Sequence, residues 1–204
     1  MPTTIDYYFA PQSPWAYLGH ARFVQMAAQE GAAVRVPPVD LGGTIFPVSG
    51  GLPLVQRAPQ RQAYRLVELA RFRDHLQLPL NLKPRHFPVV GDEAARLIIA
   101  VDQADGAAAA LKLTGAVLAA VWAQERDIAD AATRAALLAE CGLPAQRADE
   151  GRAAGVQAIY GRYTQQALAA QVFGAPSYVI EGEIFWGQDR LDFVARRLKV
   201  AHAP

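Results

Sequence analysis

Strand-like sequence occurs only near the two ends of this chain. β-Branched and aromatic residues dominate Ile5 to Phe9, and a similar run from Val34 to Val39 contains two prolines. Comparable runs return only at Ser177 to Ile180 and Glu183 to Trp186. From about residue 60 to residue 170 the sequence has helical character and no strand signal. A sheet in this protein must therefore join the two ends across a long helical middle.

A helix is expected between the first two strands. Ser13 is a favoured N-cap, Pro14 suits the first helical position, and apolar residues recur at helical spacing up to Gly31. Strand, helix and strand of these lengths form a βαβ unit, in which the two strands are parallel.

The last two strands flank Glu181-Gly182, a two-residue turn typical of a β-hairpin. A final helix is expected from about Gln188 to Lys199. Its periodicity predicts four inward-facing side chains, those of Leu191, Phe193, Val194 and Leu198.

The middle of the chain predicts helices and one loop. Residues 42–53 are rich in Gly and Pro and are expected to form the loop, and breaks divide residues 60–170 into five or six helices of ordinary length. The order of elements predicts an α/β, thioredoxin-like fold, with a βαβ…ββα core and a large all-helical insertion. Residues 1–42 and 171–204 would form the thioredoxin-like domain, and residues 43–170 the inserted helical domain.

Composition and charge exclude several classes of partner. The chain has 204 residues, 52% of them hydrophobic, and can bury a sizeable core, while a net charge of +1 gives no overall attraction to nucleic acid or to an anionic membrane. The N-terminus lacks the regions of a signal peptide, and no segment has the roughly 20 apolar residues that span a bilayer, so we expect a cytoplasmic protein. The histidines lack metal-ligand spacing, and no metal site is expected.

The only cysteine is Cys141, at an expected helix end. A single cysteine excludes an intrachain disulfide and any Cys-x-x-Cys redox or zinc site. We expect Cys141 to be a small buried apolar residue rather than a catalytic thiol.

The first candidate site residue is Ser13, where the first strand runs into the first helix. Free backbone N–H groups and the helix dipole stabilise an anion there, and the serine hydroxyl can donate one more hydrogen bond. With no base beside it, the hydroxyl suits donation to a bound thiolate better than nucleophilic attack. N-capping alone would also explain this serine.

Two further segments carry candidate residues. A cis peptide before Pro176 would leave the backbone of Ala175 free to pair with an extended peptide, although a trans proline opening an edge strand is the commoner case. Near the last helix, Asp189 can pair with an ammonium group and Arg190 with a carboxylate. The alternative there is an N-cap followed by a solvated arginine.

Three segments together resemble the 2-hydroxychromene-2-carboxylate isomerase and kappa-class glutathione transferase family, within the DsbA-like group: Ser13-Pro-Trp-Ala-Tyr-Leu, Phe173-Gly-Ala-Pro and Phe185-Trp-Gly-Gln-Asp-Arg-Leu. The resemblance extends over nearly the whole chain and implies glutathione as the cofactor. It implies that Ser13 is the catalytic residue that holds the glutathione thiolate. Ala175, before a cis Pro176, would bind the cysteinyl backbone.

The resemblance also implies roles for the residues near the last helix. Asp189 and Arg190 would contact the γ-glutamyl end of glutathione, with Gln188 beside them as a further candidate.

Two positions depart from the family pattern. Arg61 replaces a family lysine and would bind a carboxylate of glutathione, but Arg57, Arg61 and Arg65 also fit a solvated basic stripe at i, i+4 spacing. Gly51 replaces a loop asparagine, which removes one expected contact and leaves the exact substrate open.

The family resemblance implies an enzyme, a glutathione-dependent isomerase that interconverts 2-hydroxychromene-2-carboxylate and trans-o-hydroxybenzylidenepyruvate-type aromatic catabolites through a thiolate adduct. Its partners would be a small aromatic carboxylate substrate and a second copy of the chain in a homodimer. Two alternatives remain open: a kappa-like glutathione transferase or peroxidase acting on other electrophiles, and a non-catalytic thioredoxin-like peptide-binding module.

Overall fold

The sheet contains strands from both ends of the chain, which confirms the predicted α/β, thioredoxin-like core. The computed structural model describes residues 2–201. The strand order is β2-β1-β3-β4. β1 and β2 are parallel, whereas β3 is antiparallel to both β1 and β4. The strand bounds are Thr4–Tyr8 for β1, Ala33–Arg35 for β2, Ser177–Ile180 for β3 and Glu183–Trp186 for β4.

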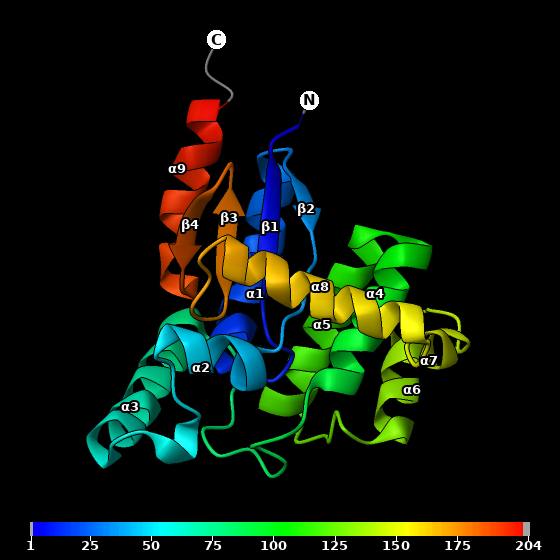
Figure 1. Cartoon of the computed structure of the whole chain (residues 1–204). Coiled ribbons are helices and arrows are strands. Elements are labelled where there is room, and N and C mark those ends of the chain that lie inside the picture. The colour runs from blue at the N-terminus through cyan, green and yellow to red at the C-terminus, as the bar shows by residue number, and fades with distance from the viewer. Residues whose placement is uncertain (1, 202–204) are drawn as a thin grey trace.

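Helices cover both faces of the sheet and form a further group beside it (Figure 1). α1 (Pro14–Gln29) and α9 (Leu191–Ala201) lie on one face, and α8 (Ala154–Ala169) crosses the other. The others are α2 (Phe46–Ser49), α3 (Pro59–Leu76), α4 (Asp92–Asp105), α5 (Ala107–Trp122), α6 (Ala131–Glu140) and α7 (Arg147–Glu150). The helical middle is therefore confirmed, although α7 has only 4 residues.

Alternating side chains of the strands build the core on both faces of the sheet. Tyr7 and Tyr178 point towards α1 and α9, where their rings stack with centroids 5.5 Å apart and both pack against Phe23. Tyr8 and Val179 point to the opposite face and pack beneath α8. This alternation follows from the two-residue period of a strand.

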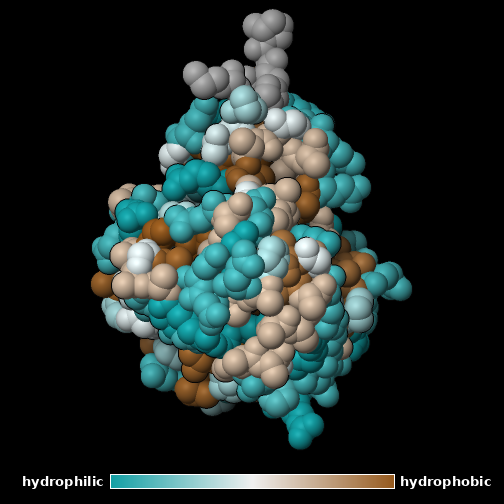
Figure 2. Space-filling model, turned by 90° about the vertical axis from the view of Figure 1, so that its right-hand side faces the viewer, coloured by the Kyte–Doolittle hydropathy of each residue, from teal (hydrophilic) through white to brown (hydrophobic). Residues whose placement is uncertain are grey.

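One hydrophobic core extends from the sheet into the helical group. Leu113, Val117 and Trp122 of α5 belong to the same buried cluster as Tyr7 and Phe23. On the side of the molecule where α4 to α7 lie, the surface has several apolar patches with hydrophilic surface between them (Figure 2). No helix between residues 2 and 201 is long and apolar enough to cross a membrane. The division into two domains stays a prediction.

Two segments of the first half differ from the expected local structure. β2 ends at Arg35 rather than Val39, because Pro37 and Pro38 have no N–H to donate to a ladder, and only a bridge from Phe9 to Pro38 continues the pairing. The loop expected at 42–53 is partly helical. A π-helical turn at Leu41–Ile45 runs directly into α2.

The prediction of an inward-facing Phe193 is wrong, because this side chain is 52% exposed. A 3-10 turn at Gln188–Arg190 precedes α9, which starts only at Leu191. Val194 and Leu198 lie three and seven positions after Leu191, on the buried face of the helix. Phe193 is two positions after Leu191 and so points away from that face.

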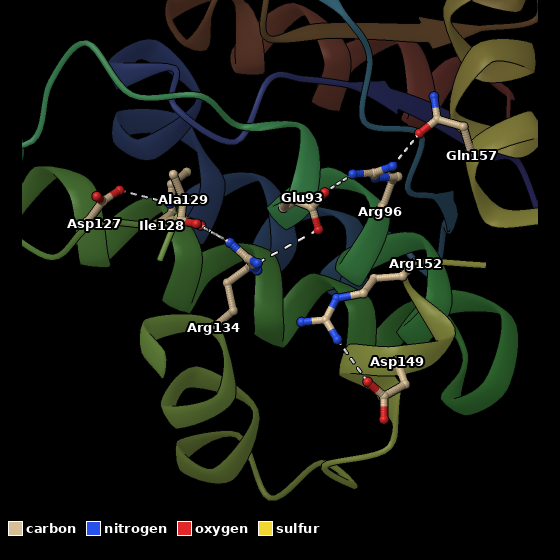
Figure 3. A network of polar contacts seen from close by, with 9 residues as sticks. All are labelled: Glu93, Arg96, Asp127, Ile128, Ala129, Arg134, Asp149, Arg152 and Gln157. Carbon is tan, nitrogen blue, oxygen red and sulfur yellow. Dashed lines mark hydrogen bonds and ion pairs between the residues drawn. The ribbon is translucent and has the colours of Figure 1, made fainter. Parts of the chain in front are cut away.

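A polar network fastens α6 to the start of α4 (Figure 3). Arg134 of α6 is buried and donates hydrogen bonds to the carbonyl oxygens of Ile128 and Ala129, at 3.0 Å and 2.7 Å. Its second terminal nitrogen lies 3.7 Å from a carboxylate oxygen of Glu93 in α4. One guanidinium therefore joins three separate stretches of chain.

We expect the Arg134→Ala substitution to lower the free energy of unfolding by about 2 kcal/mol, because the carbonyl of the buried Ile128 would lose its donor. Arg152→Ala is the matched control. Arg152 pairs with Asp149 at i, i+3 in an exposed ion pair, which contributes about 0.5 kcal/mol or less. Urea unfolding curves of both variants measure the difference, and equal losses would contradict the assignment.

A buried histidine connects the sheet, α1 and α5. The Nε2 of His20 lies 2.9 Å from the carbonyl oxygen of Leu111, so this nitrogen carries the proton and donates it. Its Nδ1 lies 3.3 Å from the hydroxyl of Tyr7, from which it accepts. Burial lowers the pKa of His20 to about 4. The folded protein therefore holds this imidazole neutral.

This histidine makes the stability of the fold depend on pH. His20 binds a proton below pH 6.5 when unfolded but only near pH 4 when folded, so its contribution is present above pH 6.5 and is lost as the pH falls towards 4. Between pH 7.5 and pH 5 the stability advantage of the wild type over a His20→Gln variant should shrink by about 2 kcal/mol. Urea unfolding of both proteins at the two pH values tests this, and a constant difference would contradict it.

Candidate active site

The fold places Ser13 next to the loop that precedes β3. Ser13 is the N-cap of α1, and its Oγ accepts a hydrogen bond from the backbone N–H of Ala16 at 3.2 Å. The same Oγ lies 3.5 Å from the carbonyl oxygen of Ala175, and the Ala175–Pro176 peptide is cis. These distant segments meet because β1 and β3 are neighbours in the sheet.

The N-cap role of Ser13 does not use its hydroxyl proton. The oxygen accepts from Ala16 and keeps its O–H available for donation. Its contact with Ala175 is long for an O–H···O hydrogen bond and is easily exchanged for a stronger acceptor. An anion at the start of α1 would be such an acceptor, and it would also meet the positive end of the helix dipole.

A cavity of about 500 Å³ opens beside this junction. Its walls come from α3, from the loop at Ala175 and from the segment after β4. Ser13 and Pro176 adjoin it through Ala175. Five of the candidate residues line the cavity itself: Arg61, Ala175, Gln188, Asp189 and Arg190.

The segment after β4 is fastened to the proline loop. The N–H of Gly187 donates to the carbonyl oxygen of Pro176 at 2.9 Å, and its φ of 100° favours glycine. Asp189 and Arg190 then form an ion pair with each other at the mouth of the cavity. Exposed ion pairs contribute little stability, so a ligand with both charges can replace this one.

Gln188 is held by a residue that the sequence did not single out. Arg22 of α1 donates to the backbone oxygen of Gln188 at 3.1 Å and also to its side-chain oxygen. The side-chain Nε2 of Gln188 is buried without an acceptor among the described residues. Arg22 thus holds the segment after β4 against the helix that starts at Ser13. No motif marks Arg22, and only the fold places it there.

Arg57, Arg61 and Arg65, the three arginines at i, i+4 spacing, have different surroundings. Arg57 precedes α3, and the other two lie on this helix. Arg57 donates to the carbonyl oxygen of Leu52 at 2.8 Å, and Arg61 is exposed to solvent. Arg65 is buried instead, and its guanidinium lies over the rings of Phe87 and Trp122. The alternative of a solvated basic stripe therefore does not hold for Arg65.

A family model described as "DSBA-like thioredoxin domain" matches residues 4–199. The chain belongs to this family. It shares 27% identity over 196 residues with a 2-hydroxychromene-2-carboxylate isomerase from Sphingobium xenophagum, a match that covers 95% of this chain and 97% of the relative. A protein of the same name from Pseudomonas putida is 27% identical over 190 residues, which cover 92% of this chain and 90% of the relative.

Solved structures agree with membership of the DSBA-like family. A structure of a 2-hydroxychromene-2-carboxylate isomerase superposes with a TM-score of 0.79 at 22% identity, covering 97% of this chain and 95% of the other. A putative protein disulfide isomerase from Nitrosomonas europaea gives a TM-score of 0.75 at 16% identity, with both chains covered completely. At these identities the likeness establishes the fold, and the predicted DsbA-like class is confirmed.

Unlike a dithiol member of the DSBA-like family, this chain has no cysteine at the start of α1. Its single cysteine, Cys141, is buried at the C-terminal end of α6, and burial raises the pKa of its thiol. The expectation of a buried, unreactive Cys141 agrees with this position. Dithiol exchange is excluded for a chain with one cysteine.

The glycine at position 51 has a physical explanation in this DSBA-like protein. A Cβ atom on Gly51 would overlap the ring of Phe46, which lies in α2. The loop can therefore not hold an asparagine there unless Phe46 moves.

Proposed function

We propose that this DSBA-like protein is a glutathione-dependent isomerase that interconverts 2-hydroxychromene-2-carboxylate and trans-o-hydroxybenzylidenepyruvate-type compounds. The observation that carries the proposal is the position of the Ser13 hydroxyl, 3.5 Å from the carbonyl oxygen that precedes a cis proline at the edge of a basic cavity. The relatives named 2-hydroxychromene-2-carboxylate isomerase match this chain over more than nine-tenths of its length and support the proposal.

The residues around the cavity suit glutathione, an extended tripeptide with two carboxylates, one ammonium group and one thiol. Asp189 can accept from the ammonium group, and Arg190 and Arg61 can donate to carboxylates. The backbone of Ala175 can pair with the peptide as an added strand does. The Nε2 of Gln188, which has no acceptor among residues 2–201, is a further donor at the same wall.

The role of Ser13 is to keep a sulfur atom negatively charged. Its O–H donates to the anion, and the start of α1 stabilises the charge, as helix N-termini do for low-pKa thiols. Bound glutathione would supply a thiolate that adds reversibly to a conjugated double bond and so permits rotation about it. The side chains of Trp15, Phe72 and Trp186 offer apolar walls for an aromatic ring.

The proposal is tested with purified protein and 2-hydroxychromene-2-carboxylate, followed by absorbance with and without reduced glutathione. We expect conversion only when glutathione is present, and calorimetry should give one glutathione site per chain. A chlorinated nitroaromatic and cumene hydroperoxide are assayed in parallel. Faster turnover of either would instead identify a kappa-like transferase or peroxidase. Affinity for extended peptides with none for glutathione would identify a peptide-binding module and overturn the proposal.

A further inference from the structure

Arg65 is a buried cation at the wall of the cavity. It lies on α3, its side chain is 8% exposed, and it lines the cavity together with Arg61 and Ala175. Burial and, to a smaller extent, the charge of Arg57 lower the pKa of Arg65 to about 10. A group with this pKa still carries its positive charge at neutral pH.

No carboxylate within residues 2–201 forms an ion pair with Arg65, and its guanidinium donates no hydrogen bond to that part of the chain. Its Nη2 is fully enclosed and has no acceptor in the described part of the chain. Removing a charged group from water without pairing it is costly, so most buried arginines have a carboxylate partner. Arg65 is an exception among residues 2–201, and the residue also lines an open cavity.

The contacts that Arg65 does make fix its position without neutralising it. The guanidinium carbon lies 5.2 Å from the ring centre of Phe87 and 5.5 Å from that of Trp122. Both rings attract the cation through their faces, which compensates part of the lost hydration. Trp122 also donates from Nε1 to the carbonyl oxygen of Gln12 at 3.3 Å. One ring therefore connects Arg65 to the residue that precedes Ser13.

The acidic groups at the cavity are already paired with other arginines. Glu68 forms an ion pair with Arg71, and Asp189 forms one with Arg190. Arg61 is exposed, so water and salt screen its charge. A negative charge inside the cavity would therefore be screened less in its interaction with Arg65 than in its interaction with Arg61.

We propose that Arg65 binds the carboxylate of the aromatic substrate, while the ring of that substrate packs against Trp15 and Phe72 in the same cavity. This inference rests on the proposed function for the identity of the substrate. It assigns the substrate carboxylate to Arg65 and leaves the carboxylates of glutathione to Arg61 and Arg190. A charge-assisted hydrogen bond from the guanidinium to the carboxylate would fix the direction in which the ring enters.

The experiment uses calorimetry with trans-2-hydroxycinnamate and with its uncharged amide, in the absence of glutathione. We expect the wild-type protein to bind the carboxylate at least tenfold more tightly than the amide. In Arg65→Met the two affinities should become equal, whereas Arg65→Lys should keep part of the difference. Arg73→Gln is the matched control, because Arg73 lies on the same helix, pairs with Asp74 and does not line the cavity.

Two further measurements separate this inference from its alternatives. Thermal melting of Arg65→Met shows whether the variant is folded. If it is not folded, the inference is tested by comparing the preference for the carboxylate over the amide in wild type and in Arg65→Lys. The affinity of Arg65→Met for glutathione should stay within about threefold of wild type. A tenfold loss there, with cinnamate binding unchanged, would assign Arg65 to glutathione and overturn the inference. If wild type binds the cinnamate through Arg65 but does not isomerise, the proposed function fails and the carboxylate site remains.

Discussion

The Ser13→Ala substitution should lower the isomerase turnover about a hundredfold. The variant loses the hydroxyl that we propose donates to a bound thiolate, and removal of one donor to a developing or bound anion commonly has an effect of this size. The pKa of the thiol of bound glutathione should rise by about one pH unit or more, because a hydrogen bond to a charged group contributes about 1.5–3 kcal/mol. The ultraviolet absorbance of the thiolate, followed as a function of pH, measures this pKa directly.

Capping must be separated from anion binding at Ser13. Alanine also removes the acceptor for the N–H of Ala16, which costs about 1 kcal/mol of stability. Glycine is a better N-cap than alanine, so Ser13→Gly should lower the stability by only about a few tenths of a kcal/mol. Because Ser13→Gly also lacks the hydroxyl, it should be as inactive as Ser13→Ala but more stable than that variant. Ser13→Thr keeps the hydroxyl and should keep most of the activity. An unchanged thiol pKa in Ser13→Ala would refute the role of the serine.

The Trp122→Ala substitution should lower the free energy of unfolding by about 3–5 kcal/mol. Trp122 is completely buried at the end of α5, its ring packs against Phe87 with centroids 4.8 Å apart, and it covers the guanidinium of Arg65. Truncation would leave a cavity, unpair the carbonyl oxygen of Gln12 and remove one of the two rings that hold a buried cation. Urea unfolding followed by circular dichroism measures the loss.

Trp186→Ala is the matched control for this prediction. Trp186 is a tryptophan of the same volume that is half exposed at the cavity mouth, where its ring contacts Phe173. Its truncation to alanine should lower the free energy of unfolding by less than about 1 kcal/mol, since surface substitutions away from the core change stability little. Similar losses in the two variants would mean that the burial of Trp122 does not determine its contribution.

The parts of this fold that sequence predicts are those set by local patterns. The cap at Ser13, the turn at Glu181-Gly182 and the four strands depend on the properties of a few adjacent residues, and the structure confirms them. The sheet that joins both ends also follows, because no other strands were available to pair with β1. The binding roles of the candidate residues stay predictions, although five of them line one cavity.

The parts that the sequence does not predict depend on contacts between distant segments. Arg57, Arg61 and Arg65 share one helical spacing, yet only Arg65 meets two aromatic rings, which come from other parts of the chain. Periodicity places residues on a common face of a helix but does not say what covers that face. Phe193 is the converse case, an apolar residue on the outer side of α9, where it stays 52% exposed.

The pairing of β1 with β3 has a consequence for how the protein is made. β1 and α1 leave the ribosome before β3, and all of α2 to α8 must follow before Ser177 can pair with Tyr8. The helical group can thus pack early, whereas the junction between Ser13 and the loop at Ala175 forms only when synthesis is nearly complete. A nascent chain stalled before β3 would carry an unpaired edge on β1 and have no assembled active site.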